Sequence, residues 1–212
     1  GRFRYRNNKI CGGLMTTPDY IVDGTLTDGE AWVQLESTTV AGSAASITWQ
    51  TATTGVDNWS QYMDLFIVAY GRGSGSATAQ QVYMHFNNVT TGEYYGQDFE
   101  ASGGTASAHH YAAASQMLLG HFPAATGLAN AFGSTIAECY NMNSGNWIPV
   151  MAVNAGDRSP GSAAGAGYAE LQASMWGSYM PIQRIDLHAI SDTFEVGSRF
   201  DLYGILPRMV TA

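Results

Sequence analysis

Charged side chains are scarce in this sequence. Asp, Glu, Lys and Arg together make up 12% of its 212 residues, and Lys9 is its only lysine. That fraction is about half of the ~25% that is usual in soluble domains. Small residues are abundant instead, among them 25 glycines, and the chain has 12 tyrosines. Because the centres of protein interfaces are depleted in charge and enriched in tyrosine, we expect a homo-oligomer, with a trimer favoured, or a protein bound to a partner.

The few basic residues are concentrated at one end. Arg2, Arg4, Arg6 and Lys9 are four of the nine in the chain. Taking these four from nine leaves five basic residues against 17 acidic ones, so the rest of the chain has a net charge of −12. A nucleic-acid-binding face must neutralise phosphates, so the acidic body excludes nucleic acid as a partner.

Cysteine and long apolar runs are also lacking. Cys11 and Cys139 are the only cysteines, and neither belongs to a CxxC pair, which argues against a zinc site or a disulfide framework. One long-range disulfide stays open, although two buried free thiols are the simpler interpretation. No apolar run approaches ~18 residues, so we expect no transmembrane helix and no membrane partner. The basic N-terminus has no apolar segment that would make it a signal peptide.

Catalytic motifs are missing as well. The chain contains neither GxSxG nor HExxH, and its acidic residues are scattered, so only a carboxylate pair brought together by the fold stays open. "GRGSG" (71–75) resembles a phosphate-binding loop, but it joins two predicted strands instead of opening a helix. We therefore predict no enzyme activity, no cofactor and no metal.

The histidines give no metal-ligand pattern. His109 and His110 are adjacent, and neighbouring side chains seldom bind one ion together. His85, His121 and His188 are each isolated within apolar patterns. We expect these three to be hydrogen-bonded groups of the core or of an interface.

What the sequence does contain is alternation of apolar and polar residues, the period of β-strands. The apolar run 62–72 predicts a central strand covered on both faces, and with 80–88 it predicts a hairpin around the turn at 71–76. The turn "MNSG" (142–145) separates two further strands. The remaining predicted strands have the same character and lie at 31–38, 45–51, 94–96, 131–141, 146–154, 168–179, 182–191 and 198–205.

Only 105–122 has helical character, because it is rich in alanine; a strand over 116–122 is the alternative. Strands every ~10–15 residues with turn residues between them indicate a sandwich or a barrel. We predict an all-β fold: a single jelly-roll-like β-sandwich over 25–212, one short helix, and an extended N-terminal arm over 1–24. In such a sandwich Phe200 and Leu202 of the last strand, or their neighbours, point between the sheets.

Three segments resemble a family of tailed-bacteriophage virion proteins. They are "YMDLFIVAYGRGS" (62–74), "VYMHFNNVTTGEYYG" (82–96) and "IQRIDLHAISDTFEVGSRFDLYGI" (182–205), of which the closing "GSRFDLYGI" is the most specific. The resemblance implies a jelly-roll or related β-sandwich that decorates capsids or forms part of a tail or fibre. The arm and the region 103–135 do not match the pattern.

The resemblance gives two functional hypotheses. The first is a capsid decoration (cement) protein that binds the major capsid protein, or neighbouring virion subunits, on the outer capsid surface. The second is a receptor-binding module of a tail fibre or spike that recognises glycans by aromatic stacking. Its candidate residues are tryptophans, although tryptophans in strands more often belong to the core; they are Trp49, Trp59, Trp147 and Trp176.

We place partner binding in the arm. In "GRFRYRNNK" an extended strand would present Arg2, Arg4 and Arg6 on one side and Phe3 and Tyr5 on the other. A disordered basic tail is the open alternative, since termini often fray. Arginine forms carboxylate forks better than lysine does, so the arm, with Lys9 at its end, is expected to reach an acidic patch on a neighbouring subunit or on the shell.

Overall fold

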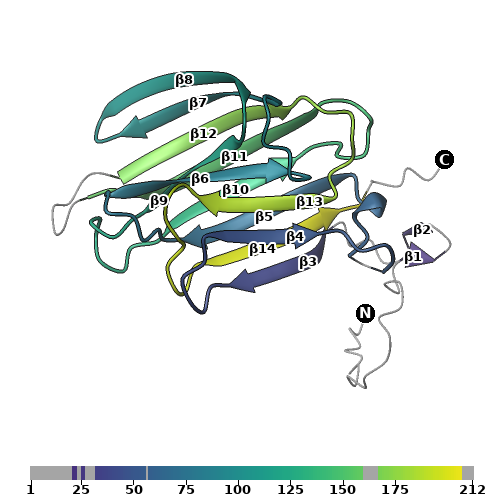
Figure 1. Ribbon diagram of the computed structural model, residues 1–212, viewed down its shortest axis with the longest axis horizontal. Helices are drawn as coiled ribbons and strands as arrows, with labels where there is room; N and C mark the ends of the chain where they lie inside the picture. Colours follow the sequence, from purple (N-terminus) through teal and green to yellow (C-terminus); the bar gives the residue numbers. More distant parts are fainter. Residues whose placement is uncertain (1–20, 23–24, 27–31, 56, 160–166, 207–212) are drawn as a thin grey trace, which may run out of the picture.

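Two antiparallel sheets form the body of the protein in the computed structural model, which describes residues 21–22, 25–26, 32–55, 57–159 and 167–206 (Figure 1). The predicted all-β sandwich is confirmed. The larger sheet has eight strands, in the spatial order β3 (Trp32–Thr39), β14 (Arg199–Ile205), β5 (Asp64–Gly71), β10 (Gly133–Cys139), β11 (Ile148–Asp157), β12 (Gly167–Trp176), β7 (Tyr94–Ser102) and β8 (Thr105–Ala114).

The smaller sheet has four strands, in the order β4 (Ser46–Gln50), β13 (Arg184–Ala189), β6 (Ala79–Phe86) and β9 (Met117–Pro123). Two short strands, β1 (Ile21–Val22) and β2 (Thr25–Leu26), pair with each other. Among the described residues, the 3-10 turn η1 (Trp59–Gln61) is the only helical element, and no helix is long and apolar enough to cross a bilayer.

The core lies between the sheets and is closed by the last strand. β14 pairs with β3 on one side and with β5 on the other, and Phe200 and Leu202 are fully buried, as predicted. The ring of Phe200 lies 4.7 Å from that of Phe194 and 6.2 Å from that of Phe122. Because these three rings come from β14, β9 and the connection before β14, they join the two sheets at one end of the sandwich.

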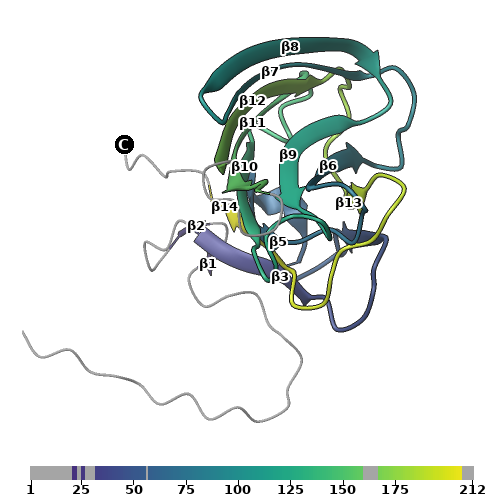
Figure 2. The same cartoon turned by 90° about the vertical axis from the view of Figure 1, so that its left-hand side faces the viewer.

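The eight-stranded sheet is wider than the sheet that faces it. Its surplus strands curl, so that β12, β7 and β8 arch over β9 and β6 (Figure 2). β9 packs beneath β11 and β12. The large sheet therefore has a concave side toward β9 and a convex side toward solvent.

The helix predicted over 105–122 is wrong. The segment forms β8 and β9, two strands in different sheets, and the alternative strand over 116–122 matches β9. Alanine favours helix only weakly, and tertiary pairing overrides that preference. Here β8 pairs with β7 from Thr105 to Ala114 and interrupts its register only near Ala113, which has a φ of 50°.

The hairpin predicted over 62–88 is also wrong. β5 belongs to the large sheet and β6 to the small one, so the segment 71–76 carries the chain across the sandwich. It approaches the core closely, because a Cβ at Gly71 would collide with the ring of Phe122 and one at Gly73 with the side chain of Gln80. The glycines therefore serve a close crossing between sheets and not a tight hairpin turn.

β5 is central, as predicted, but only one of its faces is covered. Leu65, Ile67 and Ala69 are buried against the small sheet, while Tyr70 on the other face is 52% exposed. Apolar residues on both faces of β5 therefore do not mean that both are buried. The outward ones contribute to the convex face described below.

Replacing Phe200 by alanine should destabilise the protein by about 3–5 kcal/mol, through lost burial and a cavity among the three rings. Phe99→Ala is the matched control, because Phe99 lies in the same sheet with its side chain 53% exposed; it should cost less than ~1 kcal/mol. Urea unfolding measures both values. Equal losses for the two variants would contradict the described core.

Candidate functional site

The convex face of the large sheet carries a row of outward apolar side chains. Five of these side chains lie side by side across five neighbouring strands. In the register of the sheet each is directly opposite the next, in the order Val68 of β5, Ile136 of β10, Val153 of β11, Leu171 of β12 and Phe99 of β7. We call these five residues the apolar row. The last four are exposed, from 39% for Leu171 to 55% for Val153. Ala108 of β8 continues the row to the edge of the sheet.

Charged residues flank the apolar row at its β5 and β10 end, where Asp201 of β14 lies opposite Val68 and Glu138 of β10 lies opposite Met151. Met151 lies in the next row and Met175 in the row beyond it, with exposed fractions of 46% and 37%. The outward positions from Pro149 to Ala155, from Ala169 to Met175 and from Tyr95 to Ala101 include no charged residue. Contiguous exposed apolar surface of this kind is rare on monomeric proteins and marks interaction sites.

A hollow lies beside the row, over β7, β8, β11 and β12. Its volume is about 460 Å³, and Phe99, Met151 and Met175 line it together with Gln97 and His110. Apolar walls with a few polar groups are the usual composition of a ligand site.

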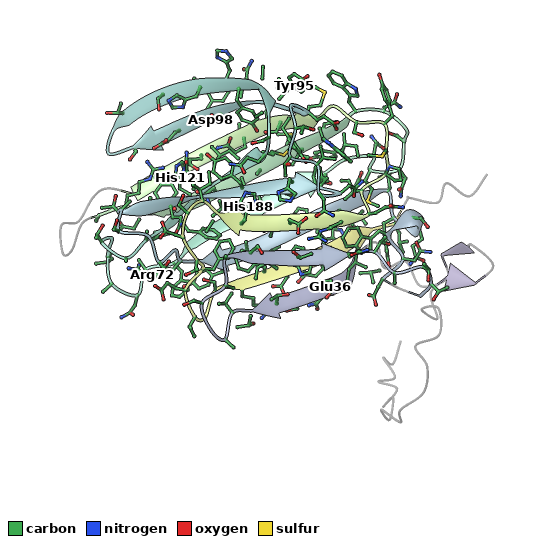
Figure 3. The ribbon with its side chains drawn as sticks, viewed as in Figure 1. Glu36, Arg72, Tyr95, Asp98, His121 and His188 are labelled. Atoms are coloured by element: carbon green, nitrogen blue, oxygen red, sulfur yellow. The ribbon has the colours of Figure 1, made fainter. Side chains whose placement is uncertain are left out.

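An aromatic pair stands next to this hollow. Tyr95, which lines it and is labelled in Figure 3, stacks on Trp147 with ring centroids 5.6 Å apart and an interplanar angle of 9°. Trp147 is 42% exposed, whereas Trp49, Trp59 and Trp176 are buried. Only one of the four tryptophans considered from the sequence is therefore available for stacking on a ligand.

The concave side of the same strands belongs in part to the apolar core, and its other part carries a buried polar network. Glu170 of β12 is 3% exposed, and its Oε1 accepts a hydrogen bond of 2.7 Å from Arg158 and lies 2.6 Å from Nδ1 of His121 in β9. Arg158 also pairs with Glu100 of β7, and its guanidinium lies 4.5 Å from the centroid of the Tyr168 ring. This network joins β7, β9 and β12, so it holds the curled half of the sheet against the small sheet.

Two further contacts attach β8 to its neighbours. His109 Nδ1 lies 2.9 Å from Oδ2 of Asp98 in β7, and Tyr111 and Ser174 share a hydrogen bond of 2.7 Å. The hydrogen bond to Asp98 raises the pKa of His109. Both amide atoms of Gln172, which is 1% exposed and lies opposite Asp98, have no hydrogen-bond partner among the described residues.

A second group of histidines lies on the outer face of the small sheet. His85 Nε2 is 3.3 Å from Asp186, which also accepts hydrogen bonds from Thr48 and Arg184. His188 Nε2 is 2.7 Å from the side-chain oxygen of Gln116, and the rings of His85 and His188 are 5.1 Å apart. Both histidines are partly buried, and burial lowers the pKa of each, against the opposing effect of Asp186.

The other residues considered from the sequence fall into three groups. His85, His121 and His188 are hydrogen-bonded or ion-paired, as predicted. His109 and His110 point to opposite sides of β8, and no group of three or more His, Cys, Asp or Glu side chains within the described ranges could hold a metal ion. Cys139 is a buried free thiol whose pKa is raised by burial, while Cys11 lies outside the described residues.

The predicted arm cannot be placed against these surfaces. Arg2, Phe3, Arg4, Tyr5, Arg6 and Lys9 all lie outside the described residues. The apolar row was not predicted from the sequence. Its signal is the presence of apolar residues at both phases of a strand, as in Val150, Met151, Ala152 and Val153. In the run 62–72 the same signal predicts a strand covered on both faces.

His85 and His188, the partly buried histidines of the small sheet, predict how stability depends on pH. A histidine whose folded pKa lies below its unfolded value of about 6.5 binds fewer protons when folded, so stability is lost as pH falls below ~6.5. The double variant His85→Gln/His188→Gln should lose less stability between pH 7 and pH 5 than the wild type, as measured by urea unfolding.

His109→Gln is a control that should change the pH dependence of stability in the opposite direction. Because the pKa of His109 is raised, its contribution is present at low pH and lost as pH rises, so its removal should slightly steepen the loss of stability on acidification. Equal pH dependence in the double variant and the wild type would contradict the assignment.

Comparisons with known proteins find no relative of this chain. It matches no protein-family model, no curated protein and no solved structure.

Proposed function

We propose that this chain is a structural protein of a tailed-bacteriophage virion, specifically a capsid decoration protein on the outer surface of the shell. The apolar row is the observation that carries the proposal. A sheet face with exposed valine, leucine, isoleucine and phenylalanine and no charge between them suits burial against protein. Neither catalysis nor a cofactor is part of the proposed role.

We further propose that the fold is a jelly roll, which the strand order supports. A jelly roll places its first, eighth, third and sixth strands in one sheet, and its second, seventh, fourth and fifth in the other. If β1 and β2, which pair only with each other, and β7, β8, β11 and β12 are set aside, the order β3-β14-β5-β10 follows the first pattern and β4-β13-β6-β9 follows the second. Jelly rolls are common in viral capsid proteins, so this order agrees with the family resemblance of the sequence.

The four other strands of the large sheet are two insertions into that order. β7 and β8 lie between β6 and β9 in the chain, and β11 and β12 lie between β10 and β13. Both insertions extend the same sheet, and they carry three of the five residues of the apolar row: Phe99, Val153 and Leu171. Function commonly resides in features added to a shared fold, so the insertions are the proposed attachment surface.

In this proposal the major capsid protein or a neighbouring virion subunit covers the apolar row. A homo-oligomer, with a trimer favoured, would cover part of the same surface. The arm of residues 1–9 would add an electrostatic contact, because the remainder of the chain has many more acidic than basic residues.

Introducing a charge into the apolar row should weaken attachment. Val153→Lys is expected to reduce binding to particles stripped of the native protein by at least tenfold, because a desolvated lysine would have no partner there. Val196→Lys is the matched control, since Val196 is 57% exposed and Val153 55%. Cosedimentation with purified phage particles measures both, and equal binding of the two variants would refute attachment through the row.

Deleting residues 1–9 should leave the sandwich folded and weaken attachment. The triple variant Arg2→Ala/Arg4→Ala/Arg6→Ala should make the remaining binding less sensitive to salt, because screened charge pairs are removed. Cosedimentation between low and physiological ionic strength measures this, with circular dichroism as the control for folding. A truncated protein that binds as well as the wild type would exclude a role for the arm.

The stacked pair of Tyr95 and Trp147 favours a second candidate function, a glycan-binding module of a tail fibre or spike. Exposed aromatic rings beside a hollow with Gln97 and His110 on its wall are suited to sugar rings and their hydroxyl groups. Quantitative gel densitometry of purified particles separates the two candidates. A decoration protein is present in hundreds of copies and a fibre module in at most tens.

A further inference from the structure

β8 is an open sheet edge with none of the usual protection. It is the last strand of the large sheet, and from Thr105 to Ala112 every residue is exposed except the half-buried Tyr111. In an antiparallel ladder alternate residues direct both backbone groups to the same side, so about four N–H and about four C=O groups point away from β7. Edge strands are normally guarded by lysine, other charges, proline, bulges or short length. This stretch has no charged residue other than histidine and no proline, and the register shift lies beyond it, toward Ala113.

The other edges of the two described sheets are better guarded. β3 carries Glu36 and has a register irregularity in its pairing with β14. β4 has only five residues, and β9 lies beneath β11 and β12. The lack of protection is therefore specific to β8, within the part of the chain that the structure describes.

We propose that β8 pairs antiparallel with β8 of a second copy of this chain, with Ala108 on the two-fold axis. One surface is then sufficient for both partners, because a two-fold contact is isologous. A strand without fixed charges can face its own copy without repulsion, and the alanines on its convex side leave space for the partner. The contact does not rest on the proposed virion function.

The register follows from the side chains. A two-fold axis perpendicular to the sheet keeps both convex faces on one side, so even-numbered residues must oppose even-numbered residues. An axis at Ala108 places His110 opposite Ala106 of the second copy. An axis at His109 would instead bring together two histidines that each bind Asp98 and whose pKa is raised.

The apolar row gives an independent reason for a second copy. The row runs from Val68 through Phe99 to Ala108 and stops at the unpaired edge. With Ala108 opposite its own copy, the row would continue without interruption into the second molecule. The pair would then present one apolar face of twice the length.

Ala108→Glu tests the contact, because it places two like charges across the axis. The dimer dissociation constant, measured by sedimentation equilibrium, should rise at least tenfold. Ser37→Glu on β3, the opposite edge of the same sheet and also exposed, is the control and should leave it unchanged within twofold. A wild type without concentration-dependent pairing would overturn the proposal, and so would a loss in Ser37→Glu equal to that in Ala108→Glu, which would indicate pairing of β8 with β3.

Single cysteines test the axis. In a Cys11→Ser background, Ala106→Cys, Ala108→Cys and His110→Cys place a thiol at successive positions of the convex side, and Cys139 can stay because it is buried. Disulfides need Cα atoms about 4.4–6.8 Å apart, a distance that only the residue on the axis has to its own copy. Ala108→Cys should therefore form most of the covalent dimer on oxidation. Equal crosslinking of the three variants, or none in any, would overturn the two-fold pairing.

Discussion

A four-stranded sheet cannot cover an eight-stranded one, and most features of this protein depend on that mismatch. The strands β3, β14, β5 and β10 have a partner sheet, and their inner residues form an ordinary aromatic and aliphatic core. The surplus strands curl around β9, and their concave side is filled in part by core residues such as Val150 and Trp176 and in part by the network of Glu170, Arg158 and His121. Their convex side and their last edge have no partner within the described chain, so apolar side chains and backbone groups are left for other molecules.

This arrangement separates stability from recognition. Phe200, Phe194 and Phe122 close the covered half of the sandwich, and all three side chains are fully buried. The curled half is held on its concave side by core packing, ion pairs and hydrogen bonds, and its convex side carries exposed apolar side chains. The low charge of the sequence agrees with this arrangement. Valine, leucine, methionine and alanine occupy outward positions of the convex face where charged side chains would normally contact solvent.

The sequence predicts well where the strands lie in the chain but poorly which strands pair with each other. Alternation locates most of the strands but misses β1, β2, β8 and most of β7. It also identifies the buried phase of β14, because local burial and local pattern agree there. The 71–76 crossing was mistaken for a hairpin, since the same glycines permit a tight turn and a close passage across the core. The segment of β8 predicts a helix because it is rich in alanine, and only pairing with β7 decides its conformation. The apolar row depends on register between strands distant in the chain, which no single segment reveals.

The proposed attachment to a phage shell through the convex face is tested most directly by electron microscopy of intact phage particles that carry this protein. The account predicts density for the sandwich at many equivalent positions on the outer shell, with the convex face of β10, β11, β12 and β7 turned toward a neighbouring subunit. Density in which that face points into solvent, or a protein confined to a few copies at the tail, would contradict it.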